Sequence, residues 1–350
     1  MRYYLQTVPG IETIARRELQ DSLDGSRIVA SAPGRVVFDY PGDPRRLLDL
    51  GTAEDVFALV AHDEISAARR GLRQARDLVR KSPLLRRAVQ AHRTVRGRGP
   101  RRPGVRVVSQ RVAGKPAYRR VDLQSAVSEA IVRAFPGWKL VADDAHIECW
   151  VLQDRDELLC GLRLSDRTMR HRDYKQATVP ASLRPVVARA MVLISEPSVD
   201  DVFTDPMCGA GTILIERGQH SPYAYLIGGD LDTEALAATR KNIGPRYKPI
   251  GILQLDAGRL PLSDGSVHKL VSNLPFGKKS RGAAGEATLY AEFLEQAVRV
   301  LRPDGVAVLL TSQTRLLNRL VGERNALRVD TTCKIEVLGQ RATIFRVRRV

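Results

Sequence analysis

The 350-residue chain lacks any apolar run approaching the roughly 18 to 20 residues that a membrane-spanning helix requires. Its opening residues, Met1–Gly10, also lack the basic-then-apolar order of a secretory signal. Apolar residues nevertheless make up 43% of the chain, which is enough to fill the cores of two or three ordinary domains. These features predict a globular cytoplasmic protein with no membrane partner.

Cysteine pairs are lacking as well. The four cysteines form no C-x-x-C pair and have no histidine at ligand spacing: Cys149, Cys160, Cys208 and Cys333. Zinc sites depend on such spacings, and four scattered cysteines do not suggest a disulfide framework either. The sequence therefore predicts reduced, mostly buried thiols and no metal site.

Acidic residues are almost absent from one window of the chain. Between Ser66 and Arg120 there are 18 Lys or Arg and a single acid, Asp77, a surplus equal to the +17 of the whole chain. A basic field attracts phosphate backbones and gives affinity that does not depend on base sequence. The window therefore predicts a polyanionic partner. Five arginines on a Gly/Pro-rich loop are expected to contact its phosphates: Arg93, Arg96, Arg98, Arg101 and Arg102.

The predicted elements of the first half indicate an α+β arrangement. Apolar spacing predicts a strand, a helix and a strand within the first 40 residues, at Tyr3–Thr7, Ile11–Leu23 and Arg35–Phe38. The elements predicted after them are helices at Ser66–Arg80 and Leu123–Ala134, and strands at Val105–Gln110, Ala145–Gln153 and Leu158–Leu164. The polar, basic stretch Ser165–Thr178, followed by Pro180 and Pro185, is typical of a linker.

The second half alternates between strands and helices, as a parallel sheet requires. Strands are predicted at Val199–Thr204, Ala224–Gly228, Gly251–Gln254, Lys269–Ser272 and Val306–Leu310. Helices are predicted from Thr212, over Thr233–Asn242 and over Ala287–Leu301, and two strand-like runs end the chain. The pattern predicts an open α/β sheet, in which ligands sit at the carboxyl ends of the strands.

Three of these strands end in residues suited to a nucleoside ligand. The first leads into Asp205 and the turn Gly209-Ala210-Gly211, whose glycines let the backbone approach a ligand closely. The second ends at Asp230, about 20 residues later, where a carboxylate can accept hydrogen bonds from both hydroxyls of a ribose. The third leads to Asp256 and Ala257, a place suited to an adenine amino group.

The fourth strand ends in the most specific feature of the chain, Asn273-Leu274-Pro275-Phe276. An exocyclic aromatic amine is a weak nucleophile because its lone pair is delocalised into the ring. A side-chain amide oxygen and a backbone carbonyl that both accept from the amino group localise that lone pair and aim it. The proline fixes the turn, and the aromatic ring offers a stacking surface for a base. The motif therefore predicts methyl transfer to an exocyclic amine.

The sequence lacks the residues that several other reactions would require. Neither G-x-G-x-x-G nor G-x-x-x-x-G-K-S/T is present, which argues against a nicotinamide or ATP enzyme. Methylation of cytosine C5 needs a cysteine nucleophile near the fourth strand, and Cys208 lies on a different loop. The histidines show no ligand spacing, and no catalytic role is expected for them.

Taken together, these residues resemble the class I methyltransferases with an N/D-P-P-Y/F type motif, and more narrowly the THUMP-domain guanine-N2 methyltransferases. The resemblance covers nearly the whole chain. It rests on Val8–Glu12, Arg106–Gln110, Tyr118–Leu123, Arg170–Lys175 and Leu183–Pro185 in addition to the strand ends. It implies a ferredoxin-like domain at 1–50, a THUMP RNA-binding domain at 51–165, a linker at 166–180 and a Rossmann-like methyltransferase domain at 181–350. The last would have a seven-stranded sheet with an antiparallel edge hairpin.

The resemblance also implies a cofactor and residue roles. S-adenosylmethionine would be held at its methionine part by Asp205, Gly209 and Gly211, at its ribose by Asp230 and at its adenine by Asp256. Neighbouring contacts are expected from Met207, Cys208, Thr212, Leu231, Ala257 and Asn273. Asn273 and the Leu274 carbonyl would hold the guanine N2 amine, and Phe276 would stack on the base after the Pro275 turn. Arg172, Lys278 and Lys279 complete the expected RNA contacts.

Several functions stay open at this level. The resemblance favours N2-methylguanosine formation in tRNA, at position six of the acceptor stem, by direct in-line transfer. Guanine methylation of ribosomal RNA fits the same domain plan, and a DNA adenine-N6 methyltransferase would use an almost identical fourth-strand motif. A catalytically silent RNA-binding protein is a further alternative. The sequence fixes neither the number of methyl groups added nor the oligomeric state, for which a monomer is favoured.

Overall fold

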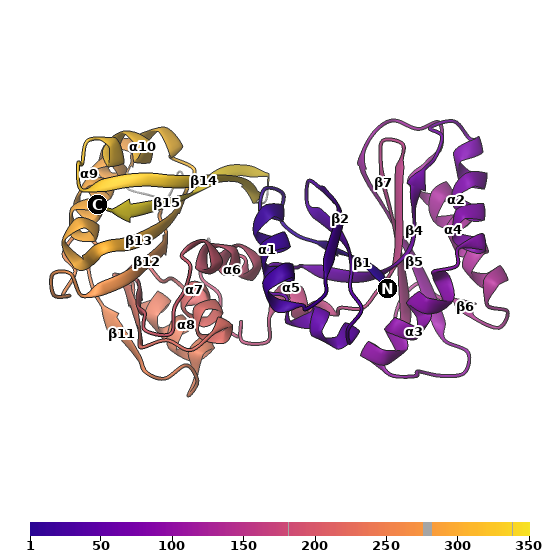
Figure 1. Cartoon of the computed structure of the whole chain (residues 1–350), viewed down its shortest axis with the longest axis horizontal. Coiled ribbons are helices and arrows are strands. Elements are labelled where there is room, and N and C mark those ends of the chain that lie inside the picture. The colour runs from indigo at the N-terminus through magenta and orange to yellow at the C-terminus, as the bar shows by residue number, and fades with distance from the viewer. Residues whose placement is uncertain (181, 276–281, 338) are drawn as a thin grey trace. The chain divides into compact units, whose positions relative to one another are not determined.

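The computed structural model describes residues 1–180, 182–275, 282–337 and 339–350. The chain forms two compact units, each coloured by position along the chain in Figure 1. Unit 1 comprises Met1–Gln6 and Leu19–Met169, and unit 2 comprises Thr7–Glu18 and Arg170–Val350. Two helices, α1 (Glu12–Ser22) and α5 (Arg167–His171), begin in one unit and end in the other.

Unit 1 is built on one sheet with the strand order β2-β3-β1-β4-β8-β7-β5-β6 in the described residues. The strands are β1 Arg2–Gln6, β2 Arg27–Ala32, β3 Arg35–Asp39, β4 Asp55–Glu64, β5 Gly104–Ala113, β6 Lys139–Leu140, β7 Ile147–Asp154 and β8 Glu157–Arg163. The helices are η1 Pro44–Asp49 (3-10), α2 Arg70–Lys81, α3 Leu85–Arg96 and α4 Arg120–Ala134. Because β4 pairs with both β1 and β8, the sheet is continuous across the boundary expected at residue 50. The division into ferredoxin-like and THUMP domains stays a prediction.

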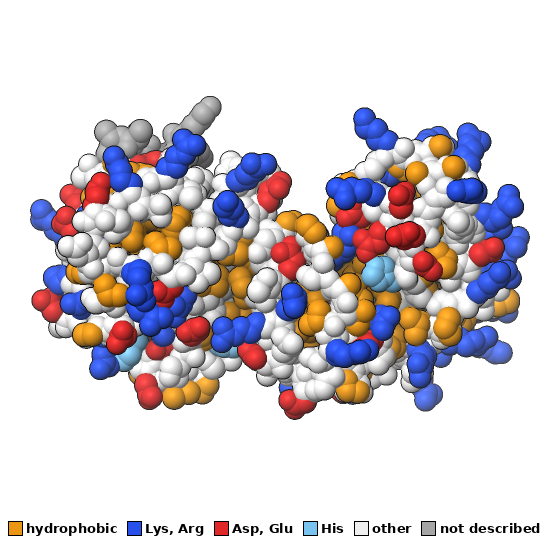
Figure 2. Space-filling model, turned by 45° about the horizontal axis from the view of Figure 1, so that its top comes forward, with side chains coloured by type: hydrophobic (Ala, Val, Ile, Leu, Met, Phe, Trp, Pro, Cys, Tyr) orange, Lys and Arg blue, Asp and Glu red, His pale blue; other side chains and the backbone are white. Residues whose placement is uncertain are grey.

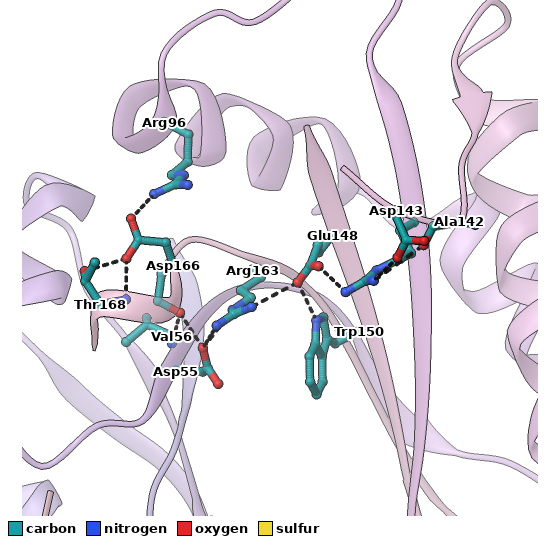
Figure 3. A network of polar contacts seen from close by, with 12 residues as sticks. Asp55, Val56, Arg96, Ala142, Asp143, Glu148, Trp150, Arg163, Asp166 and Thr168 are labelled. Carbon is teal, nitrogen blue, oxygen red and sulfur yellow. Dashed lines mark hydrogen bonds and ion pairs between the residues drawn. The ribbon is translucent and has the colours of Figure 1, made fainter. Parts of the chain in front are cut away.

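A chain of ionic contacts joins four strands of this sheet (Figure 3). The carboxylate of Asp55 at the start of β4 is fully buried and accepts from Arg163 Nε of β8 at 2.7 Å. Arg163 also donates to Glu148 of β7 at 3.1 Å, and Arg106 of β5 donates to the other oxygen of that carboxylate at 2.6 Å. Buried charges are tolerated only when they are paired in this way, so the network holds the middle of the sheet in one register.

Unit 2 is an open α/β sheet with the strand order β11-β10-β9-β12-β13-β15-β14. Its strands are β9 Val202–Asp205, β10 Tyr225–Asp230, β11 Ile250–Gln254, β12 Val267–Asn273, β13 Leu301–Thr311, β14 Leu327–Val337 and β15 Gln340–Arg349. Its helices are α6 Pro185–Ile194, α7 Thr212–His220, α8 Thr233–Ile243, α9 Gly282–Val300 and α10 Thr314–Gly322. The strands from β11 to β13 are parallel, and β13, β15 and β14 are antiparallel. This confirms the predicted Rossmann-like sheet with its antiparallel edge hairpin.

The core of unit 2 lies on both faces of its sheet. Along β13, Val308 packs with α6 on one face, whereas Leu309 packs with α9 and α10 on the other. Both side chains are fully buried, as expected for a strand covered by helices on both sides. Val8 and Ile11 belong to the α6 face, so a segment from the start of the chain completes this core.

The sequence analysis did not predict β2, β4, β6, η1, α3, α5, α6 or α10, and α5 lies in the stretch that it interpreted as a linker. One omission changes the position of predicted site residues. Arg93 and Arg96 lie in the last turn of α3, so the prediction that they lie on the Gly/Pro-rich loop was wrong. The helix forms because Leu85, Ala88 and Val89 bury one face of it, and Gly97 ends it with a φ of +85°.

Candidate active site

The carboxyl ends of four parallel strands meet at one edge of the unit 2 sheet. Because β11, β10, β9 and β12 are neighbours, the residues that follow them are brought side by side. Asp230 and Asp205 are the last residues of β10 and β9, Asn273 is the last of β12, and Asp256 lies two residues beyond β11. The structure therefore gathers the strand-end residues that the sequence predicted.

The turn after β9 is shaped by backbone hydrogen bonds to β10. Gly209 N donates to Asp230 Oδ2 at 2.9 Å, and Cys208 N donates to the Gly229 carbonyl at 2.8 Å. Gly209 and Gly211 have φ angles of +54° and +76°, a region that side chains other than glycine rarely adopt. A Cβ on Gly211 would also lie 3.0 Å from Thr239 Cγ2. Both glycines are thus required by the turn itself.

Two residues of helix α8, which the sequence analysis did not single out, hold this turn in place. Thr239 Oγ1 donates to the Gly209 carbonyl at 2.6 Å, and Asn242 Nδ2 donates to the Ala210 carbonyl at 2.9 Å. Asn242 also accepts from Ala177 N at 2.8 Å, so one buried amide joins the turn to the segment before α6. Neither residue stands out in the sequence, because each lies within an ordinary helix.

Two cavities open at this edge and share Met207, Asp230 and Pro275. The larger has a volume of about 470 Å³ and is also lined by Leu231, Asp256 and Ala257, and by Glu286, Leu289 and Glu292 of α9. The smaller, of about 260 Å³, is also lined by Asp205, Cys208, Gly209, Thr212 and Asn273, and by Val179, Ser182 and Leu183. The predicted cofactor contacts thus divide between them, apart from Gly211, which supports the turn. The α9 residues, Val179 and Ser182 carried no signal of a site in the sequence.

Asp205 is the most buried acid of the site, with 1% of its surface exposed. Its Oδ1 accepts from Ser272 Oγ at 2.8 Å and from Met207 N at 3.3 Å. Burial, with a smaller contribution from the charge of Asp230, raises the pKa of this carboxyl from 3.8 to about 7, although the hydrogen bonds from Ser272 and Met207 oppose the shift. A cationic ligand in the smaller cavity would favour the ionised form.

The fourth-strand motif presents an amide oxygen with no partner. Asn273 Oδ1 is shielded from solvent and has no hydrogen-bond partner among the described residues. Its neighbour Leu274 is fixed by donation from its N to the Leu310 carbonyl of β13 at 3.0 Å. A buried acceptor without a donor costs free energy, so an N–H group of a ligand fits this position. Phe276, Lys278 and Lys279 lie outside the described residues.

A buried ionic cluster fixes the polypeptide that leads into the smaller cavity. Glu216 of α7, 0% exposed, accepts from Arg189 Nε at 3.0 Å, from Arg172 Nε at 3.3 Å and from Tyr174 Oη at 2.8 Å. The side chain of Arg172 is only 13% exposed. The structure thus places this predicted RNA contact inside unit 2, where it orients the segment before α6.

The five arginines predicted to contact phosphates lie at the surface of unit 1. Arg93, Arg96, Arg98, Arg101 and Arg102 are all exposed, although Arg96 Nη1 donates to Asp166 Oδ2 at 2.7 Å. Figure 2 shows Lys and Arg side chains gathered along unit 1 on the side where α2 and α4 lie in Figure 1.

Within the described ranges, no helix is both long and apolar enough to cross a membrane.

Comparison with known proteins agrees with the geometry. Residues 172–341 match the family described as RMKL-like, methyltransferase domain. The human tRNA (guanine(6)-N(2))-methyltransferase THUMP3 is 30% identical over 223 residues, which cover 59% of this chain and 44% of that protein. The Thermus thermophilus tRNA (guanine(6)-N2)-methyltransferase is 29% identical over 63% of this chain and 66% of its own length.

A solved structure shares the fold over the full chain. The crystal structure of TrmN from Thermus thermophilus matches with a TM-score of 0.79 and 24% identity, covering 100% of this chain and 99% of that one. The chain therefore shares the fold of TrmN in both of its units. It spans about half the length of the human relative.

Proposed function

We propose that this chain, whose residues 172–341 match the RMKL-like methyltransferase family, methylates the N2 amine of a guanine in tRNA with S-adenosylmethionine as donor. The observation that carries the proposal is the unpartnered amide oxygen of Asn273, placed at the same sheet edge as Asp205 and Asp230. An acceptor beside two carboxylates suits an amino group that must meet a cationic methyl donor.

The residues of the two cavities fit the cofactor. The tight Gly209–Gly211 turn lets the backbone approach a ligand, and Asp205 supplies a carboxylate for the methionine ammonium. Asp230 already accepts from Gly209 N and Asp232 N, and a carboxylate has about four acceptor sites, so its oxygens can still accept from ribose hydroxyls. Leu231, 57% exposed, and Ala257 offer apolar surface beside Asp256 for an adenine. When bound, S-adenosylmethionine supplies the electrophilic methyl group.

The protein's own part in the transfer is positioning. Asn273 Oδ1 and the Leu274 carbonyl accept from the guanine amino group and orient its lone pair, which raises the reactivity of a weak nucleophile. No strong general base is needed, because the amine can lose its proton after it has become cationic. Phe276 remains the expected stacking partner of the base.

The RNA part of the proposal rests on charge and on the relatives. The basic window of unit 1 supplies a field for a phosphate backbone, and Arg98, Arg101 and Arg102 are exposed on the loop after α3. The two relatives compared above carry the name of tRNA guanine-6 N2-methyltransferases. We therefore infer that position six of tRNA is the target, and that the protein acts in the cytoplasm.

The test is methylation of undermodified tRNA with labelled S-adenosylmethionine, followed by mass spectrometric mapping of the modified nucleoside. We expect N2-methylguanosine at position six. Transfer of the label to ribosomal RNA, or formation of N6-methyladenine when DNA is the substrate, would assign the protein to one of the alternative classes. Absence of cofactor binding by calorimetry would make it a silent RNA-binding protein.

The variant Asn273→Ala tests the role of the unpartnered amide oxygen. It removes the amide acceptor, so we expect turnover to fall on the order of 10²–10³-fold with cofactor affinity largely kept. Asn318→Ala, at an exposed position of α10, is the matched control and should leave turnover unchanged. Near-normal turnover of Asn273→Ala would contradict the assigned role.

A further inference from the structure

A second basic surface lies on unit 2, separate from the Arg-rich window of unit 1. A cleft of about 700 Å³ opens between the start of α10 and the β14–β15 hairpin. Arg315 of α10, Lys334 of β14 and Arg341 of β15 line it, and all three side chains are exposed. Figure 1 shows α10 and the β14–β15 hairpin at the same end of unit 2.

The floor of this cleft is fixed by the segment that precedes α1. Glu336 N donates to the Pro9 carbonyl at 3.2 Å, and Cys333 Sγ donates to the Gly10 carbonyl at 3.0 Å. A Cβ on Gly10 would lie 2.0 Å from the Lys334 carbonyl oxygen, so the two backbones are in direct contact. Thr314 and Thr343 Oγ1 atoms are 3.0 Å apart and join α10 to β15. These contacts join the three segments that form the cleft.

The cleft begins at the end of β13, the strand that pairs with β12 of the fourth-strand motif. Leu310 of β13 stands opposite Asn273 of β12 in the parallel register. Ser312, which lines the cleft, is two residues further along, a separation of at most about 7 Å along the chain. A nucleic acid base that reaches Asn273 must leave its stack, which brings its own backbone to this edge of the sheet.

The charge of the cleft suits that backbone. Three of its side chains are cationic, and among the described lining residues only Glu336, opposite Arg341 across the hairpin, is acidic. No ion pair joins Arg315, Lys334 or Arg341 to another described residue, whereas Arg189, Arg299 and Arg346 of unit 2 are each paired with a carboxylate. Exposed cations without internal partners are available to phosphates.

We propose that this cleft binds phosphates of the RNA strand immediately next to the methylated nucleotide. The inference rests on the proposed function, because it takes the RNA as substrate. It adds a contact on unit 2 itself, which holds the target strand at the site, to the non-specific attraction exerted by the basic window of unit 1. The expected ligand chemistry is a phosphodiester backbone, with no selection of base sequence.

The test is the triple variant R315Q/K334Q/R341Q in the full chain, with methylation of undermodified tRNA as the readout. We expect the KM for tRNA to rise on the order of tenfold, with kcat and the cofactor dissociation constant within about twofold of the unaltered protein. The salt dependence of tRNA binding should flatten by about one unit of slope for each phosphate that the variant no longer binds.

A control variant, K241Q/K248Q/R319Q, removes three exposed cations from unit 2 outside the cleft. It changes the net charge equally, so equal effects of both triple variants would overturn the inference in favour of a general charge effect. An unchanged KM and slope in the cleft variant would also overturn it. If the unaltered protein fails to methylate any tRNA, the proposed function fails instead, so the two failures are distinguishable.

Discussion

The hydroxyl of Tyr290 donates to the Pro275 carbonyl at 2.9 Å and lies 2.8 Å from Thr311 Oγ1. This one buried side chain of α9 joins the fourth-strand motif to the end of β13. Burial raises the pKa of Tyr290 to about 12, so the hydroxyl stays a donor at any pH at which the protein is used. The turn that presents Asn273 is therefore fixed from the side of α9.

Tyr290→Phe removes that donor while keeping the ring in the core. We expect a loss of about 1 kcal/mol in the free energy of unfolding, and a lower kcat with unchanged cofactor affinity, because the turn loses its anchor. Thermal denaturation and single-turnover methylation measure the two effects. Tyr225→Phe, at a position 40% exposed, is the control. Equal turnover in both variants would show that Tyr290 does not position the turn.

Protonation of Asp205 should couple to cofactor binding. An unfolded carboxyl loses its proton near pH 3.8, whereas burial holds the pKa of folded Asp205 at about 7. The folded state therefore binds the extra proton between these values, and this group's contribution to the free energy of unfolding decreases as the pH rises from 3.8 to about 7. A bound cationic cofactor favours the ionised carboxylate and so lowers the pKa of Asp205. The cofactor affinity should therefore rise with pH up to about 7 and then level off.

Calorimetry in buffers of different ionisation enthalpy measures the coupling of Asp205 directly. At about pH 6 we expect cofactor binding to release a proton from the site, and at about pH 8 to release none from this group. Asp205→Asn should bind more weakly and lose this pH dependence. Equal proton release by Asp205→Asn and the unaltered protein would assign the titration to another group.

Glu216→Gln should lower the free energy of unfolding of unit 2 strongly. The substitution leaves Arg172 and Arg189 without their buried counter-charge, a change that costs about 3–5 kcal/mol in comparable sites. The segment that carries Val179 and Leu183 would then be held less firmly, so the KM for the cofactor should also rise. Glu323→Gln is the control, because its pair with Arg319 is exposed and worth about 0–1 kcal/mol. Thermal denaturation of both variants compares the two losses.

The loop after α3 should supply part of the tRNA affinity. We expect R98Q/R101Q/R102Q to reduce the salt slope of tRNA binding by about one unit for each phosphate that these arginines neutralise in the unaltered protein. The control R27Q/R45Q/R133Q removes exposed arginines of unit 1 that are paired with Asp39, Asp43 and Glu129. An unaltered slope in the loop variant would show that the loop is not an RNA contact.

The strand-end residues were predictable because local rules decide them. Glycines at positive φ, an acid that follows a buried strand and an Asn-x-Pro-Phe turn each leave a pattern within a few residues. Asp205, Gly209, Asp230 and Asn273 therefore lie where the sequence placed them. By contrast, Arg172 was expected at the surface because it lies in a basic stretch, and its burial against Glu216 depends on a helix 44 residues away.

The sequence by itself determined the α/β class of the second half and which residues follow its strands. Only the tertiary structure decided that Tyr290 and Asn242 support the candidate site, that Val8 and Ile11 complete the core of unit 2, and that Arg315, Lys334 and Arg341 share a cleft. The reason is physical. Periodicity and turn chemistry act between near neighbours in the chain, whereas burial and ion pairing join residues that only the folded sheet brings together.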